Sequence, residues 1–304
     1  VDPRYDEEEY NVGLSQIKAI LPNLENLPQL QLQRNLYDAL YGGNERALVI
    51  SPEIVEKASI KDVENVCKRL FGNVAGATVY IVGNIDAGTL KPLVTKFIAS
   101  LPGGKKGSKF IDRKDGIVEG KIVKEVVVPM ETPKSTTIQV YTANIPYSIE
   151  NDVLLNIAKL YLDMVYVETL RESEGGTYGA SVVNKTDREP KEMAMLQVIF
   201  ETNPESVKKL SDLAVEGVHK LITDGIPADK FDMIIQNIKK NIPQDRISNI
   251  YWVNALRDYA EYGDMYDSEY EKAVDNATPE AVVELVKNLV DAGNFIQLTM
   301  SPEE

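Results

Sequence analysis

The residues that could do chemistry in this sequence gather around one pair of glycines. Arg171 lies four positions before Gly175, and Tyr178 lies two positions after Gly176. A guanidinium and a phenol are both hydrogen-bond donors, and two donors at one corner of a fold can bind the carbonyl oxygens of an extended peptide. The pattern therefore predicts a peptide-binding corner. The alternative remains that Arg171 only caps a helix and that Tyr178 fills a core, since short motifs often occur by chance.

A helix followed by a strand is expected to position this pair. Apolar residues recur with helical spacing between positions 154 and 170, and the glycine pair is a typical helix stop. Arg171 is thus expected in the last helical turn, where the helix dipole favours a cation. From Thr177 to Val182 the side chains alternate between two sets, as in a strand with two different faces.

Length, charge and cysteine content set the outer limits. The chain has 304 residues, of which 43% are hydrophobic, enough for one large or two ordinary globular domains. A net charge of −14 argues against a nucleic-acid partner or an anionic membrane surface, and no apolar run approaches the roughly 20 residues of a membrane span. The single cysteine, Cys67, excludes an internal disulfide and leaves the compartment open between cytoplasm and periplasm. Because the sequence opens with Val1, we expect a processed or excised piece from which a leader could have been removed.

No catalytic or metal site is expected within this chain. His219 is the only histidine, which excludes a two-histidine metal site, and it lies off the apolar stripe of its helix, as a surface residue would. The loop from Gly83 to Gly88 follows a strand pattern but lacks the lysine and hydroxyl of a phosphate-binding loop. No cofactor is therefore predicted for these residues.

The whole pattern predicts an α+β protein. Asn151 is expected to cap the long helix that leads to Arg171, and Ser59 and Thr278 are expected to cap two others. Strands are expected at Thr78–Val82 (buried), Val123–Val128, Thr136–Tyr141, Gly176–Asn184, Met193–Glu201 and Asn294–Met300, with helices over most of the remaining chain.

An internal repeat organises these elements. The helix pattern at Ser59–Phe71 matches that at Thr278–Val290 at an offset of 278 − 59 = 219 positions, and each is followed by a β-rich run, Thr78–Val82 or Phe295–Thr299. Chance similarity is the alternative, because helix-then-strand is a common unit. If the repeat is real, residues 1–103 are a copy that has lost its N-terminal part, residues 104–120 are a linker, and residues 121–304 are a complete copy.

These motifs resemble one peptidase family. Leu170–Glu172 followed by Gly175–Ser181 resembles the arginine–tyrosine signature in the C-terminal half of pitrilysin/insulinase-type zinc metallopeptidases. Val79–Asp86 and Ser100–Pro102 resemble the end of that family's third domain, most closely in bacterial periplasmic members, and residues 121–304 resemble its fourth domain. The family's H-x-x-E-H zinc motif belongs to its N-terminal half, and this sequence contains no such motif.

The resemblance implies a fold of duplicated domains, each a mostly antiparallel sheet with helices packed on one face, the first copy here being incomplete. It implies that this chain is the substrate-binding, non-zinc part of an endopeptidase for peptides or small unfolded proteins, inactive alone. Zinc and the glutamate base would lie on a missing N-terminal half. Arg171 and Tyr178 would donate to substrate carbonyls or to the oxyanion, and Thr177 and Gly179 would offer backbone groups to the peptide as an added strand. A periplasmic location would follow from the same resemblance.

A second hypothesis keeps the fold without the chemistry. The chain would then be a catalytically inactive partner subunit, or a binding or assembly protein, as in paired-subunit relatives of this family. An H-x-x-E-H motif upstream in the same reading frame would favour the enzyme part, and a native start near residue 1 would favour the subunit. A purely structural scaffold is a third option.

Overall fold

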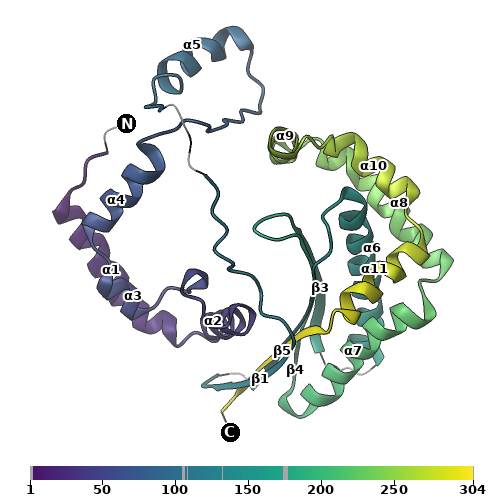
Figure 1. Ribbon diagram of the computed structural model, residues 1–304. Helices are drawn as coiled ribbons and strands as arrows, with labels where there is room; N and C mark the ends of the chain where they lie inside the picture. The colour runs from purple at the N-terminus through teal and green to yellow at the C-terminus, as the bar shows by residue number, and fades with distance from the viewer. Residues whose placement is uncertain (1–2, 105–106, 108, 132, 174–176, 304) are drawn as a thin grey trace.

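A five-stranded sheet carries the second half of the chain. The structure is a computed structural model, and it describes residues 3–104, 107, 109–131, 133–173 and 177–303. The strands are β1 (Lys121–Val128), β2 (Ser135–Ala143), β3 (Thr177–Asp187), β4 (Met193–Thr202) and β5 (Asn294–Pro302). Their order is β1-β5-β2-β4-β3, in which β1 and β5 are parallel and the other neighbours are antiparallel (Figure 1). All predicted strands beyond residue 120 are therefore present, each longer than expected or shifted by a few residues.

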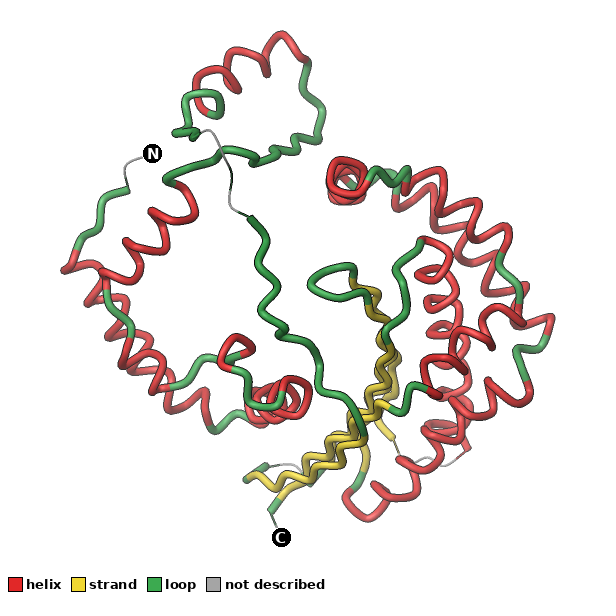
Figure 2. Tube along the Cα trace, in the orientation of Figure 1, coloured by secondary structure: helices red, strands yellow, loops and turns green. Residues whose placement is uncertain are grey.

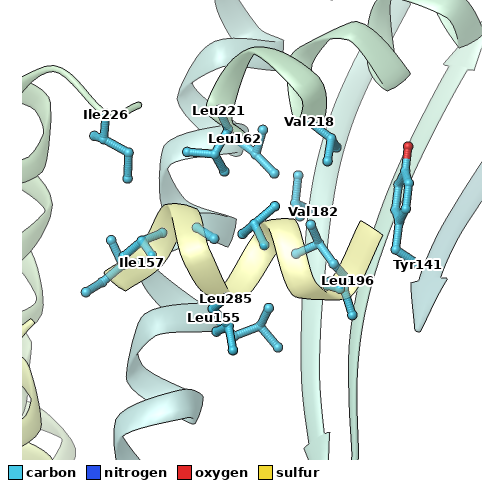
Figure 3. Close-up of a cluster of buried hydrophobic side chains, with 14 of the residues drawn as sticks. Tyr141, Leu155, Ile157, Leu162, Val182, Leu196, Val218, Leu221, Ile226 and Leu285 are labelled. Atoms are coloured by element: carbon cyan, nitrogen blue, oxygen red, sulfur yellow. The ribbon is translucent and has the colours of Figure 1, made fainter. Parts of the chain in front are cut away.

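One face of the sheet is covered by helices. The covering layer consists of α6 (Ile149–Tyr166), α7 (Val207–Asp224) and α11 (Pro279–Asp291), with α8 (Ala228–Asp245) and α10 (Tyr266–Asn276) packed outside α6. Figure 3 shows the side chains of α6, α7, α11, β3 and β4 that meet in this layer. Leu155, Ile157 and Leu162 of α6 are fully buried there. Leu155 and Leu162, seven residues apart, lie on one side of the helix, and Ile157, two residues from Leu155, lies on another, because α6 contacts β3 as well as α8, α10 and α11.

A second, smaller apolar layer lies on the other face. Ala39 and Leu40 of α2 (Pro28–Tyr41) pack against Ile138 and Val140 of β2 and Ile296 of β5. An ion pair of 2.7 Å joins Lys124 Nζ on β1 to Asp38 Oδ2 on α2. The helix α1 (Glu7–Glu25) and the short α3 (Pro52–Lys57) extend from α2 away from the sheet (Figure 2).

The remaining N-terminal elements lie apart from both layers. The helices α4 (Ile60–Phe71) and α5 (Ala87–Phe97) contain no buried residue. The buried strand predicted at Thr78–Val82 is wrong: in the described structure the segment is not part of any strand, and Val79 and Ile81 are half-exposed. Its β-rich composition only permits a strand, whereas forming one requires a neighbouring strand to complete the hydrogen bonds.

Two details of the helices also differ from expectation. Ser148, not Asn151, is the N-cap of α6, because the Ser148 hydroxyl accepts a hydrogen bond of 3.0 Å from the Asn151 backbone nitrogen. The helix α10 was not predicted: its sequence is mostly polar, and its buried residues are Ala273 and Val274. The predicted α+β class, with a mostly antiparallel sheet and its main helical layer on one face, is confirmed.

Candidate functional site

The candidate site is the corner where α6 gives way to β3. The helix continues past Tyr166 into a π-helical turn, η2 (Val167–Ser173), so Arg171 belongs to the last helical turn as expected. Turns of this type are rare, and they occur frequently at functional sites. The strand β3 begins at Thr177, directly beyond residues 174–176.

A β-bulge lies at the start of β3. Thr177 pairs with Thr202 of β4, and Gly179 pairs with Glu201, so Tyr178 is an extra residue with no partner position of its own. Bulges locally bend a strand and are over-represented next to active sites. Glu201 is held in turn by Lys134, whose Nζ lies 2.8 Å from both carboxylate oxygens. The backbone at the predicted site thus departs from regular structure on both the helical and the strand side.

The predicted site residues lie partly outside the described residues. Residues 174–176, and the side chains of Arg171, Thr177 and Tyr178, are outside the described part of the structure. The chain places the backbones of Arg171 and Tyr178 on the two sides of residues 174–176. Convergence of their side chains on one peptide stays a prediction.

Buried contacts fix the helical side of the corner. Tyr166 is fully buried, and its hydroxyl donates a hydrogen bond of 2.6 Å to the carbonyl oxygen of Ala214 on α7. Burial raises the pKa of Tyr166 well above its ordinary value, so the phenol stays a neutral donor. Gly217 makes this close packing possible, and Leu170 is fully buried within η2. Sequence reasoning missed Gly217, although a glycine inside an apolar helix face is itself a signal of close approach.

Two contacts made by charged side chains tie the corner to its surroundings. Lys230 of α8 lies 2.7 Å from Glu168 Oε1 of η2, and this hydrogen bond raises the pKa of Lys230. The Asp163 carboxylate of α6 accepts a hydrogen bond of 2.7 Å from the Val182 backbone nitrogen on β3. Because β3 is the last strand of the sheet, Val182 is thereby bonded on its outer side. The Val182 nitrogen at this edge of the sheet is therefore already occupied by a side chain of α6.

A polar cavity of about 640 Å³ lies at the other end of β3, and sequence reasoning did not identify it. The Arg188 Cζ atom there lies 3.7 Å from the ring centroid of Tyr147 and 4.1 Å from that of Tyr262, and the guanidinium forms an ion pair with Asp264. These contacts join the turn between β3 and β4 to the end of α9 (Asn249–Tyr262). The two ring contacts and the ion pair hold the arginine in place.

Asp152 lines this cavity and has an unusual environment. Burial raises the pKa of Asp152, while Thr186, which donates to Asp152 Oδ1 at 2.7 Å, opposes the shift. A carboxyl whose folded pKa is raised stabilises the fold when protonated, and this contribution is lost as pH rises through the folded pKa.

We expect Asp152→Asn, which keeps an acceptor for Thr186, to raise the melting temperature at pH 7 and to change it less near pH 4. Thermal unfolding at both pH values checks this, with exposed Asp212→Asn as the control; an equal shift at both pH values would contradict it.

The described side chains contain no candidate metal cluster. No three histidine, cysteine, aspartate or glutamate residues in the described ranges are arranged to hold a metal ion. His219 is exposed on α7, as expected. Within the same part of the chain, no helix is long and apolar enough to cross a membrane.

Comparison with known proteins finds a family model and several relatives that match this chain. The family model of the peptidase M16 inactive domain matches residues 57–238. The probable zinc protease PqqL of Escherichia coli K12 is 23% identical over 235 residues, which cover 75% of this chain and 24% of that protein. A zinc protease PQQL-like protein of Arabidopsis thaliana is 25% identical over 198 residues, covering 59% of this chain and 20% of that protein. The chain therefore spans about a quarter or less of these relatives.

Solved structures agree with this match at the level of fold. The crystal structure of the periplasmic protease PqqL from Escherichia coli superposes with a TM-score of 0.81 at 19% identity, covering 98% of this chain and 33% of that chain. The peptidase M16 inactive domain from Pseudomonas fluorescens superposes with a TM-score of 0.79 at 14% identity, covering 100% of this chain and 73% of that chain. The predicted resemblance to the C-terminal half of a pitrilysin-type zinc protease is thereby confirmed. The helices, the sheet and the matched residues together show that this chain belongs to the peptidase M16 inactive domain family.

Proposed function

We propose that this chain is the substrate-binding, non-catalytic portion of a zinc-dependent endopeptidase that acts on peptides or small unfolded proteins. The observation that carries the proposal is the family match, which runs through the corner formed by α6, η2 and β3. The names of the relatives as zinc proteases support the class of reaction. Zinc on a partner half, either the N-terminal part of the same protein or a separate subunit, would supply an activated water.

The residues of this chain would bind and orient the peptide. Arg171 and Tyr178 would donate hydrogen bonds to substrate carbonyls or to the oxyanion as negative charge develops there. Thr177 and Gly179 would offer backbone groups to an extended peptide lying along the start of β3. The bond between Val182 and Asp163 supports a short contact, because it occupies the edge just beyond this stretch.

The organisation and location of the protein follow from the same proposal. Residues 1–103 would be the end of an incomplete third domain, residues 104–120 a linker and residues 121–304 a complete fourth domain. The periplasmic label of the PqqL structure supports a periplasmic location for this chain.

A non-catalytic partner subunit or assembly protein is the second candidate. The matched family is described as an inactive domain, which suits a subunit that has kept only the fold. A zinc motif upstream in the same polypeptide would favour the first candidate over this one.

The proposal is tested by recombining the two halves. A zinc-bearing half alone should cleave an unstructured fluorogenic peptide slowly, this chain alone should not cleave it, and the mixture should cleave it quickly. Equal rates with and without this chain would contradict a substrate-binding role and favour the assembly candidate.

Metal analysis of this chain supplies an independent check. With one histidine and one cysteine among 304 residues, we expect far less than one zinc per chain after dialysis. One tightly bound zinc per chain would contradict the assignment of zinc to another half.

A further inference from the structure

We propose that β1 pairs with β1 of a second copy of this chain. The two strands run antiparallel around a two-fold axis at Val123, and the two five-stranded sheets join into one. Lys121 of each copy then lies opposite Glu125 of the other. The proposal goes beyond peptide binding and does not depend on it, because it uses neither the corner around Arg171 nor β3.

The two outer strands of the described sheet, β1 and β3, differ in how their outer sides are occupied (Figure 1). β3 carries a bulge at Tyr178, and its Val182 nitrogen donates to Asp163 of α6. β1 runs in unbroken register with β5 from Lys121 to Val128. Natural proteins protect edge strands with bulges or covering groups, and a long regular edge invites pairing with another chain. Within the described part of the chain, β1 is therefore the edge suited to accept a further strand.

Hydrogen bonds at the two ends of β1 show which of its residues point outward. The Gly120 carbonyl oxygen accepts a hydrogen bond of 3.0 Å from the Phe295 nitrogen. The Val128 carbonyl oxygen accepts one of 3.1 Å from the Glu303 nitrogen, so the even-numbered residues bond to β5. Because the backbone groups of successive strand residues point to opposite sides, the odd-numbered residues direct theirs away from β5. These residues are Lys121, Val123, Glu125 and Val127.

The side chains of the same four residues are exposed. Val123 and Val127 are 57% and 60% exposed, although valine favours strands chiefly where its side chain packs against a neighbour. Lys121 and Glu125 are exposed as well, and they lie two residues to either side of Val123. This face of β1 therefore has an apolar centre flanked by one positive and one negative charge, a pattern that is complementary to itself when reversed.

Charge selects the register of the pairing. With Val123 on the two-fold axis, Lys121 meets Glu125 of the other copy twice, and opposite charges on facing strand residues are favourable. With Glu125 on the axis, two carboxylates would face each other, and with Lys124 there, two lysines would. Val123 is the only axis position that brings Lys121 and Glu125 together. The lysine that would otherwise discourage pairing at this edge thus sets the register.

The size and symmetry of this contact fix its expected behaviour. Residues 121, 123 and 125 of one copy face residues 125, 123 and 121 of the other, and each facing pair exchanges two backbone hydrogen bonds. A contact this small associates weakly, with a dissociation constant on the order of 10–100 µM. Because the same surface is used by both copies, the assembly closes at two chains and does not extend into a filament.

The mass of the protein in solution is the first test. Light scattering after size-exclusion chromatography should give a mass that rises from one chain toward two between roughly 1 and 300 µM. Glu125→Lys and Lys121→Glu should each weaken the dimer roughly 10-fold, and the double variant, which exchanges the two charges, should restore it. Glu131→Lys, the same charge change on an exposed residue beyond the strand, is the control and should have no effect. A constant single-chain mass, or a dimer that resists both single variants, would overturn the proposal.

Cross-linking tests the register through exposed positions, where substitution leaves the core intact. In a background of Cys67→Ser, which removes the only cysteine, Val123→Cys places two thiols opposite each other at the axis. Their Cα atoms would lie about 5.5 Å apart, within disulfide range, so oxidised glutathione should convert most of the concentrated protein to a linked dimer.

Val127→Cys is the matched control for this cross-link. Val127 is similarly exposed, but it lies four residues from the axis, so its two copies would be roughly 25 Å apart and should not link. Cross-linking of neither variant, or of Val127→Cys as readily as Val123→Cys, would overturn the proposed pairing.

Discussion

Tyr178→Phe in the zinc-bearing holoenzyme should lower peptide turnover about 100-fold, the cost found when one donor to a developing oxyanion is removed. The substitution takes away a single hydroxyl and keeps the ring. If that hydroxyl acts on substrate alone, the folded protein loses no contact of its own, and the melting temperature should stay within about 2 °C. Steady-state kinetics with a fluorogenic peptide and thermal unfolding measure the two effects together.

The control is a tyrosine in a different setting. Tyr259 on α9 is 57% exposed, so Tyr259→Phe should change neither turnover nor stability appreciably. A large fall in the melting temperature of Tyr178→Phe, with turnover reduced only in proportion to unfolded protein, would favour the alternative that Tyr178 is a core residue. Full turnover by a stable Tyr178→Phe enzyme would remove the residue from the proposed site.

Gly217→Ala should lower the free energy of unfolding by about 2–4 kcal/mol, although alanine is the better helix former. A Cβ atom at this position would lie 2.6 Å from Tyr166 Cε1 and 3.1 Å from the Tyr166 hydroxyl oxygen. The ring is fully buried and has no room to withdraw, so the hydrogen bond to Ala214 would be lost along with the packing. Urea unfolding followed by far-ultraviolet circular dichroism measures the loss.

Gly13 provides the same substitution with the opposite expectation. Gly13 lies inside α1, and a Cβ atom added there would meet nothing within 4 Å. Gly13→Ala should therefore stabilise its helix by about 0.5–1 kcal/mol through helix propensity alone. If Gly217→Ala also stabilised the protein, Tyr166 would not be held against α7 as tightly as its contacts indicate.

Local sequence signals were sufficient to predict those structural features that depend only on neighbouring residues. The hydroxyl caps at Ser59 and Thr278, the end of the helix near Arg171, and the paired strands β3 and β4 all follow from short-range patterns. A cap is decided by three or four adjacent residues, and a hairpin by two adjacent runs and the turn between them. The family resemblance likewise rested on short motifs, and the match over residues 57–238 confirmed it.

Contacts between distant parts of the chain could not be predicted from such short-range patterns. The bond from Tyr166 to Ala214, the room left by Gly217, and the Arg188 guanidinium between two tyrosine rings each join segments that only the fold brings together. The bulge at Tyr178 also depends on the register of β3 against β4, which no local sequence specifies.

The two copies of the helix-and-strand pattern show most clearly which features follow from local sequence and which depend on tertiary contacts. The amino-acid sequence by itself determined that Ser59–Phe71 and Thr278–Val290 would be capped, amphipathic helices followed by β-rich runs, because those properties are local. Only the tertiary structure decided that one run became β5, an interior strand of the sheet, and that the other stayed outside any strand, with Leu289 buried and Leu70 exposed. The reason is that burial and strand pairing are properties of a pair of surfaces, and a sequence pattern describes only one of the two.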